Sequence, residues 1–95
     1  MASTTLSPTP RLAALRALAD PVRLAVVDEL ARDGACACEL RARLELSAPL
    51  LSHHLKVLRE AGLVRTRKTG RRLEVELDRA ALARLAGSLD GEQAL

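Results

Sequence analysis

A change of hydrophobic period between residues 47 and 77 constrains the fold more than any other feature of this 95-residue chain. Before Gly62, three apolar residues recur at helical spacing and share one face: Leu51, Leu55 and Leu58. Ser47 is a favourable N-cap, Pro49 suits a first helical turn, and Gly62 is a typical stop. The pattern predicts a helix from about residue 48 to residue 61.

After this helix the apolar residues alternate, as in a half-buried strand. Residues 72–77 direct charged side chains to one face and three apolar side chains to the other: Leu73, Val75 and Leu77. An earlier arm at residues 63–67 can pair with this strand through Lys68, Thr69 and Gly70, where the glycine supplies a positive φ. The sequence therefore predicts a two-stranded hairpin, which we call the wing.

Positive charge is concentrated on the predicted helix and wing. Between Leu50 and Arg72 a single acid, Glu60, is outnumbered by seven cations: Lys56, Arg59, Arg65, Arg67, Lys68, Arg71 and Arg72. This stretch carries a net charge of +6 while the whole chain carries +3, so the remaining residues carry −3. Such a distribution favours contact with nucleic-acid phosphates.

The helix face opposite the leucines has short polar and cationic side chains that suit a DNA major groove. The DNA contacts predicted on and before this helix are Ser47, Pro49, Ser52, His53 and Lys56. Those predicted on the wing, directed to phosphates or the minor groove, are Arg67, Lys68, Arg71 and Arg72. Leu50 points sideways, toward a thymine methyl or toward the wing. His54, at the edge of the leucine stripe, is expected to be a hydrogen-bonded rim residue.

Composition narrows the partner further. The chain has no Phe, Trp or Tyr, which excludes single-strand binding by aromatic stacking and leaves duplex DNA. Its length predicts one domain with a small aliphatic core, to which a second subunit would add burial. Residues 1–10 lack the apolar run of a signal peptide and no later segment could span a bilayer, so a cytoplasmic protein is expected.

Four more helical patterns surround the wing. One begins at Arg11, with an apolar face that could pack on its own domain or, as we favour, against a second subunit: Leu12, Leu15, Leu18 and Ala19. A second, capped by Asp20 and Pro21, runs to about Asp33 with an inward face of Leu24, Val27, Leu30 and Ala31. A third covers residues 36–44, and its core-facing residues are Ala37, Leu40 and Leu44. The last covers residues 79–89, with aligned Leu82, Leu85, Ala86 and Leu89.

The predicted fold is mainly α with a small β-hairpin. It is a winged helix-turn-helix in the order ααααββα, in which the third helix and residues 48–61 form the helix-turn-helix. Residues 1–10 are expected to be a flexible arm, residues 11–89 the DNA-binding domain, and residues 90–95 a frayed tail.

Cys36 and Cys38 are the only cysteines in the chain. On a regular helix, residues two apart point about 200° apart, so binding one ion to both thiols predicts distortion of the first helical turn. The helix N-terminus and nearby Arg41 should favour thiolates. Two alternatives stay open: both residues are small core residues, or they form a redox-switching disulfide.

The sequence resembles the ArsR/SmtB family of bacterial metal-responsive repressors from about Leu12 to Leu89. The resemblance rests on three stretches, Leu-Ala-Asp-Pro-Val-Arg-Leu (18–24), Ser-His-His-Leu-Lys-Val-Leu-Arg-Glu-Ala-Gly-Leu-Val (52–64) and Arg-Lys-Thr-Gly-Arg (67–71). It implies a homodimer joined through the first and last helices that occupies an inverted-repeat operator until an inducer binds. The residues that the resemblance assigns to the dimer interface are Leu12, Leu15, Leu82, Leu85 and Leu89.

The resemblance also suggests the inducer. Cys-Ala-Cys-Glu-Leu (36–40) is similar to the Cys-Val-Cys-Asp-Leu motif of arsenical repressors, although Arg41 replaces their third cysteine. We therefore expect trivalent arsenic or antimony at Cys36 and Cys38. Cadmium or lead, with Glu39 as an oxygen ligand, and a metal-independent oxidant or persulfide signal are the alternatives. The carboxylate and imidazole site of the zinc and nickel sensors is missing, since only Asp78 matches it and no histidine follows His54.

Enzymatic chemistry has no support in the sequence. The five glycines are scattered stops and turns rather than a phosphate-binding loop. We find no paired carboxylates and no nucleophile with a base. The sequence predicts a DNA-binding regulator and not an enzyme.

Overall fold

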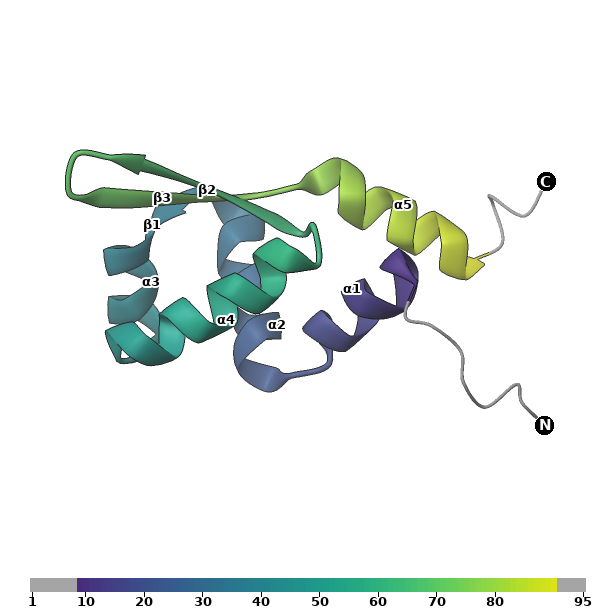
Figure 1. The fold of residues 1–95 in the computed structure, drawn as a ribbon, viewed down its shortest axis with the longest axis horizontal. Coiled ribbons are helices and arrows are strands. Elements are labelled where there is room, and N and C mark those ends of the chain that lie inside the picture. The colour runs from purple at the N-terminus through teal and green to yellow at the C-terminus, as the bar shows by residue number, and fades with distance from the viewer. Residues whose placement is uncertain (1–8, 91–95) are drawn as a thin grey trace.

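The computed structural model describes residues 9–90, which form five helices and a three-stranded antiparallel sheet (Figure 1). The elements are α1 (Pro10–Leu18), α2 (Pro21–Arg32), β1 (Ala35–Cys36), α3 (Ala37–Leu44), α4 (Ala48–Glu60), β2 (Val64–Thr69), β3 (Arg72–Leu77) and α5 (Arg79–Asp90). The predicted class, mainly α with a winged helix-turn-helix, is confirmed. Most of the predicted arm and tail lies outside the described residues.

Three helices begin where a polar side chain caps the chain just before a proline-containing first turn. Thr9 accepts a hydrogen bond from the Leu12 amide of α1 (3.1 Å). This helix begins at Pro10, one residue before the predicted start at Arg11. The Asp20 carboxylate accepts from two amides of α2, at 2.9 and 3.0 Å. Ser47 accepts from the Leu50 amide of α4 (3.3 Å). These caps satisfy amides that have no partner within the helix.

The sheet has the strand order β1-β3-β2, and β1 is the element that the sequence did not predict. The wing pairs Val64 with Leu77 at one end and Thr69 with Arg72 at the other. Gly70, with φ 61°, lies in the intervening turn as predicted. The two residues of β1 pair with Val75 and Glu74 of β3, so the observed order is ααβααββα.

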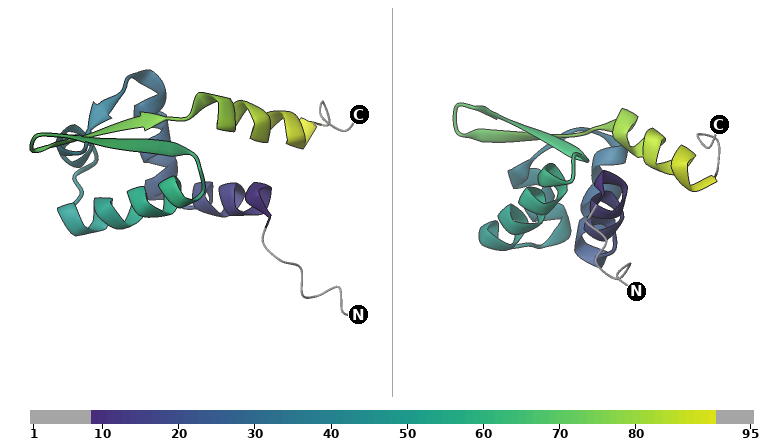
Figure 2. Two further views of the ribbon diagram at one scale, coloured as in Figure 1. Left: turned by 45° about the horizontal axis from the view of Figure 1, so that its top comes forward. Right: turned by 45° about the vertical axis from the view of Figure 1, so that its right-hand side comes forward.

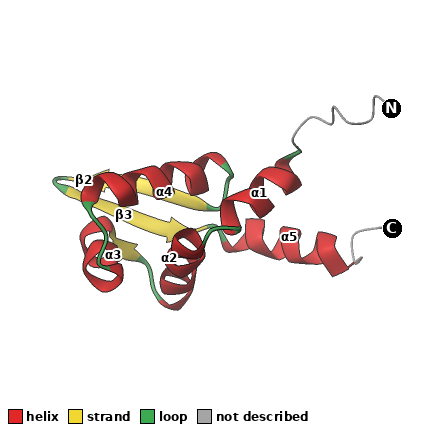
Figure 3. Cartoon of the chain, turned by 90° about the horizontal axis from the view of Figure 1, so that it is seen from below, coloured by secondary structure: helices red, strands yellow, loops and turns green. Residues whose placement is uncertain are grey.

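Helices α2, α3 and α4 cover one face of the sheet, whereas α1 and α5 lie together at one end of the molecule (Figures 2 and 3). The core between the three helices and the sheet is aliphatic, and its largest fully buried members are Leu30, Leu40, Leu51, Leu58, Leu63, Val26 and Val75. The described part is elongated, with principal extents of 48 × 27 × 23 Å. None of its helices is long and apolar enough to cross a membrane.

The buried faces of α1, α2 and α5 differ from the prediction. In α2 the buried residues are Val26, Val27 and Leu30, while Leu24 is 48% exposed and Ala31 is exposed. The assignment of Leu24 and Ala31 to the core was therefore wrong. In α1 the core is contacted by two small residues, Ala14 and Ala17, and the leucines of the predicted stripe are half-buried. In α5, Leu85 is buried and Leu89 is 54% exposed.

Candidate nucleic-acid interface and cysteine site

Helix α4 separates a buried apolar face from an exposed polar face. Leu51, Leu55 and Leu58 are buried as predicted. Every residue predicted to contact DNA on or before this helix is exposed: Ser47, Pro49, Ser52, His53 and Lys56. Leu50, at 42% exposure, lies on the same accessible side. The arrangement leaves a continuous row of short polar and cationic side chains available to a DNA groove.

A three-residue turn between α3 and α4 completes the helix-turn-helix. Glu45 adopts a left-handed conformation (φ 54°) at the end of α3, and the following Leu46 amide donates to the Arg41 carbonyl at 3.0 Å. A positive φ is uncommon outside glycine, so this turn accepts a strained residue where glycine would fit more easily. The residues that follow this turn at the start of α4, Ser47 to Leu50, are all exposed.

The wing does not present all of its cations equally. Arg65 pairs with Glu76 (3.3 Å) and Asp78 (3.5 Å), and Arg72 pairs with Glu74 (2.9 Å), which raises the pKa of Arg72 through the hydrogen bond and charge of that carboxylate. Of the seven cations in the cluster, five have no ion pair among the described residues: Lys56, Arg59, Arg67, Lys68 and Arg71. Arg72 is exposed but locally compensated, a pairing that the spacing of residues two apart on one strand could have revealed.

His54 lies inside the protein and joins α4 to α2. The residue is 6% exposed, and its Nδ1 lies 3.2 Å from Nη1 of Arg23 and 3.9 Å from the Asp20 carboxylate. A guanidinium only donates hydrogen bonds, so neutral His54 accepts one at Nδ1. Arg23 also donates to the carbonyls of Ala17 (2.6 Å) and Arg16 (3.5 Å) at the end of α1. One guanidinium thus connects three helices. The expectation of a hydrogen-bonded His54 is confirmed, but its placement at the rim was wrong, because the residue is buried.

This contact predicts a pH-dependent stability. Burial lowers the pKa of His54 below 6.5, Arg23 and His53 add to the effect, and Asp20 opposes it. The unfolded chain therefore takes up the proton first, so stability is complete above about pH 6.5 and falls as the pH drops toward the lowered value. In urea titrations at about pH 7.5 and about pH 5, the wild type should lose more stability than His54→Gln. The exposed-site variant His53→Gln should lose nearly as much stability as the wild type, because His53 is the smallest contributor to the lowered pKa of His54. A loss in His54→Gln equal to that of the wild type would contradict the prediction.

The two cysteines occupy different positions around the start of α3. Cys36 is the last residue of β1 and the N-cap of α3, with φ −84° and ψ 161°, and its side chain is 1% exposed. Cys38 lies in the first helical turn and is exposed. Their Cα atoms are 5.4 Å apart and their sulfurs form a disulfide. Because Cys36 is not helical, the sulfurs meet over a regular helix, and the predicted distortion of the first turn is not needed.

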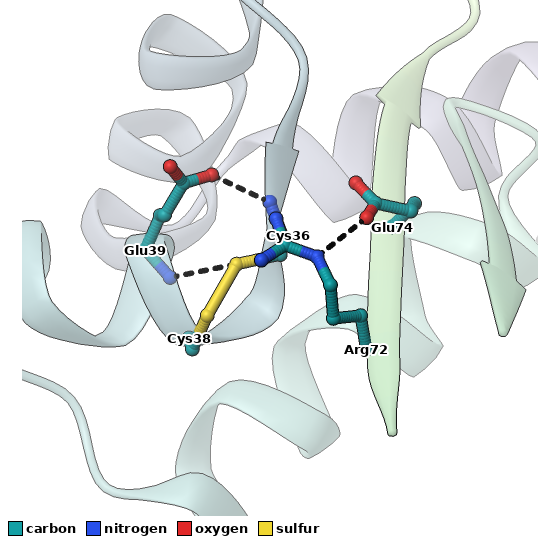
Figure 4. Close-up of a disulfide and its surroundings, with 5 residues drawn as sticks. All are labelled: Cys36, Cys38, Glu39, Arg72 and Glu74. Carbon is teal, nitrogen blue, oxygen red and sulfur yellow. Dashed lines mark hydrogen bonds and ion pairs between the residues drawn. A yellow bond between two sulfur atoms is a disulfide. The ribbon is translucent and has the colours of Figure 1, made fainter. Parts of the chain in front are cut away.

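Glu39 and Arg72 surround this pair (Figure 4). The Glu39 amide donates to Sγ of Cys36 (3.3 Å), and the Glu39 carboxylate accepts from the Cys36 amide (2.9 Å), which completes a capping box. The Glu39 carboxylate is therefore already engaged and is a poor additional ligand. On the adjacent strand, Glu74 faces Cys36 in the register and holds Arg72.

The donor set of this site is sulfur alone. Among residues 9–90, no group of three or more His, Cys, Asp or Glu side chains could hold a metal ion. Asp78, the one match to the zinc and nickel site, accepts from the Ala81 amide at the start of α5 and pairs with Arg65. Cys36 and Cys38 supply two soft donors, which fit a thiophilic species whose remaining ligand comes from outside the chain.

The exposed recognition helix, the short turn before it and the basic wing define a winged helix-turn-helix DNA-binding protein. Residues 20–66 match the family described as bacterial regulatory protein, arsR family. The arsenical resistance operon repressor of Staphylococcus xylosus is 40% identical over 76 residues, which cover 80% of this chain and 73% of that protein. A transcriptional repressor SmtB homolog from Synechocystis is 43% identical, over 64% of this chain and 46% of its own.

The fold comparison agrees with the sequence comparison. The crystal structure of an ArsR family transcriptional regulator superimposes with a TM-score of 0.80 at 28% identity, over 94% of this chain and 92% of that one. The chain belongs to the ArsR family of bacterial transcriptional regulators. It is a regulator and not an enzyme.

Proposed function

We propose that the chain is a dimeric repressor that binds an inverted-repeat DNA operator through α4 and the wing and is released by a thiophilic inducer at Cys36 and Cys38. The observation that carries the DNA-binding part is the exposed polar face of α4 beside five cations of α4 and the wing that have no ion pair within residues 9–90. We assign base contacts to Ser52, His53 and Lys56, with Ser47 and Pro49 at the helix start. Arg67, Lys68, Arg71 and Arg72 contact phosphates.

The dimer forms through α1 and α5, which lie together at one end of the molecule (Figure 2). Four of the five assigned interface residues are only partly covered by their own chain, namely Leu12, Leu15, Leu82 and Leu89. Leu85 is buried within its own core and supports the interface from behind. Two recognition helices would then meet half-sites about 34 Å apart.

The inducer is trivalent arsenic or antimony. Two observations support this assignment: the sulfur-only donor set, and the likeness to repressors named for arsenical resistance in Staphylococcus. Cadmium or lead is the less favoured inducer, because the Glu39 carboxylate that would complete such a site is bound to the Cys36 amide. The ligand bridges the N-cap and the first turn of α3, and it favours protein conformations with weaker DNA affinity.

A second function uses the same cysteines without a metal. The sulfurs of Cys36 and Cys38 are placed to form a disulfide in the folded chain, which favours a thiol–disulfide switch on the operator complex. Oxidation would remove the negative charge of two thiolates and fix the start of α3. Release by a disulfide or peroxide, and not by arsenite, would identify this function.

The operator assignment predicts separable effects of Arg67→Ala and His53→Ala. Wild-type affinity for its own promoter should exceed affinity for random duplex and fall steeply with salt. Arg67→Ala should weaken both DNAs similarly and reduce the salt slope by about one. His53→Ala should instead reduce the preference between the DNAs, by about 1–3 kcal/mol per lost base contact. Fluorescence anisotropy titrations at several salt concentrations measure both quantities.

Arg65→Ala is the matched control for this experiment, since Arg65 is already paired with Glu76 and Asp78. Its effect on the salt slope should be smaller than that of Arg67→Ala. Equal wild-type affinity for promoter and random duplex at moderate salt would reject the repressor function.

A further inference from the structure

We propose that Cys38 is the exchange sulfur of the cysteine pair and that the pocket beside it binds an anionic low-molecular-weight thiol or the corresponding disulfide. This inference rests on the second function above, in which the pair acts as a thiol–disulfide switch. It adds the class of redox partner, the role of each cysteine and the groups that select the partner. Three observations carry it: the unequal burial of the two cysteines, their unequal hydrogen bonding, and a pocket that is lined by Cys38 and three arginines but not by Cys36.

The two sulfurs differ in access and in leaving ability. Cys38 is exposed, whereas Cys36 is 1% exposed, so an incoming thiolate reaches Cys38 first. Sγ of Cys36 accepts the Glu39 amide at the N-terminus of α3, an interaction that stabilises a thiolate. A thiol with a lower pKa leaves faster in disulfide exchange. The geometry therefore favours attack on Cys38 with departure of Cys36.

The pocket at Cys38 is strongly cationic. It has a volume of about 250 Å³ between α3, α4 and the wing, and its charged lining residues are Arg41, Arg71 and Arg72. Its apolar wall comes from Leu51, Leu55 and Leu73. The Arg72 guanidinium is already paired with Glu74. Arg71 has no ion pair among the described residues, and Arg41 donates a hydrogen bond there only from Nε, to the Leu46 carbonyl. Free guanidinium N–H groups of this kind match a carboxylate on a small thiol.

Arg41 gains a specific role from this geometry. It lies one helical turn after Cys38 on α3, lines the same pocket, and leaves its Nη groups without an ion pair among the described residues. A carboxylate-bearing thiol can be held there by its negative charge. Neutral and cationic thiols gain no such contact.

The exchange is balanced in both directions. In reduction, the thiolate RS⁻ attacks Sγ of Cys38, the Cys36–Cys38 bond breaks, and Cys36 leaves as a thiolate. A second RS⁻ attacks the RS sulfur of the mixed disulfide, releasing RSSR and the Cys38 thiolate. The net reaction oxidises two small thiols and reduces one protein disulfide. In oxidation, the Cys38 thiolate attacks RSSR and expels RS⁻, after which Cys36 attacks Cys38 and expels the second RS⁻.

The selectivity is tested on the oxidised full-length chain with three thiols, namely mercaptopropionate, mercaptoethanol and cysteamine. Mass spectrometry measures the rate at which each thiol reduces the protein disulfide. Each rate is divided by the fraction of that thiol present as thiolate, and then by the rate at which the same thiol reduces a neutral small disulfide. The anionic thiol should be favoured over the neutral one, and Arg71→Gln and Arg41→Gln should each reduce the ratio by about threefold, as for partly exposed ion pairs. Arg59→Gln, an exposed change of equal charge outside the pocket, should leave it unchanged.

The roles of the two sulfurs are tested by trapping. With dithiodipropionate, reduced Cys36→Ser should accumulate a mixed disulfide on Cys38, and Cys38→Ser should react much more slowly at buried Cys36. Serine is a good N-cap, so Cys36→Ser retains the start of α3. Equal corrected rates for the three thiols, or faster adduct formation on Cys38→Ser, would overturn the proposal. Neither measurement contains DNA, so such a failure is distinct from failure of operator binding or of arsenite release.

Discussion

Arsenite should release the wild-type protein from its operator and should release neither Cys36→Ser nor Cys38→Ser. Both sulfurs are needed because each variant leaves one soft donor in the described part of the chain, and loss of a tethered second ligand weakens binding by about 10²-fold or more. The reduced protein–operator complex, titrated with arsenite and followed by anisotropy, gives the concentration for half release.

Three further titrations, with cadmium, zinc and peroxide, separate the candidate inducers on the same complex. The control is the affinity of each protein for the operator before any inducer is added. Cys36→Ser should bind the operator as tightly as the wild type, because a serine N-cap preserves α3. Unchanged arsenite release in both cysteine variants would show that neither cysteine is needed to bind the inducer. Release by peroxide with insensitivity to arsenite would favour the thiol–disulfide function.

Leu58→Ala should lower the free energy of unfolding by about 3 kcal/mol, the largest stability effect that we expect from one leucine of α4. Leu58 is 0% exposed and belongs to the aliphatic core. Its removal loses apolar burial and leaves a cavity that the surrounding leucines fill incompletely. Urea unfolding at one fixed protein concentration measures the loss, since dimerisation would make stability concentration-dependent.

Leu50→Ala is the matched control, being the same substitution in the same helix at a residue that is 42% exposed. Its effect should stay within about 0.5 kcal/mol. Comparable losses in the two variants would mean that Leu50 is covered in solution, and that the exposed side of α4 is not free for DNA.

Local signals were enough to predict the DNA-binding elements. For α4, an N-cap, a first-turn proline and a following glycine coincide with one apolar face; the wing has strict alternation and a glycine at its turn. These features act within a few residues, and here the local preferences agree with the tertiary fold, so they could be predicted without knowledge of tertiary contacts. The exposed positions of Ser52, His53 and Lys56 follow directly from the same helical period.

The wrong predictions concern features that are determined by tertiary contacts. Two residues are too few to show alternation, and β1 exists only because β3 offers a free edge. Helix α2 has apolar residues on several sides, so periodicity alone could not choose Val26 over Leu24 as the buried residue. Assigning Cys36 to a helix separated the sulfurs, whereas its extended N-cap conformation brings them together.

The two-residue strand β1 also connects the cysteine pair to two separate parts of the molecule, so a structural change at the sulfurs can reach both. Cys36 is paired through the backbone with Glu74 of the wing, and the helix it caps leads through three residues to α4. Helix α4 and the wing, to which we assign the DNA contacts, are thus both connected to the backbone around Cys36. Movement of the backbone around Cys36 would change the angle between α4 and the wing. Each element could then still fit its own groove, while the two together would no longer match the pitch of a duplex.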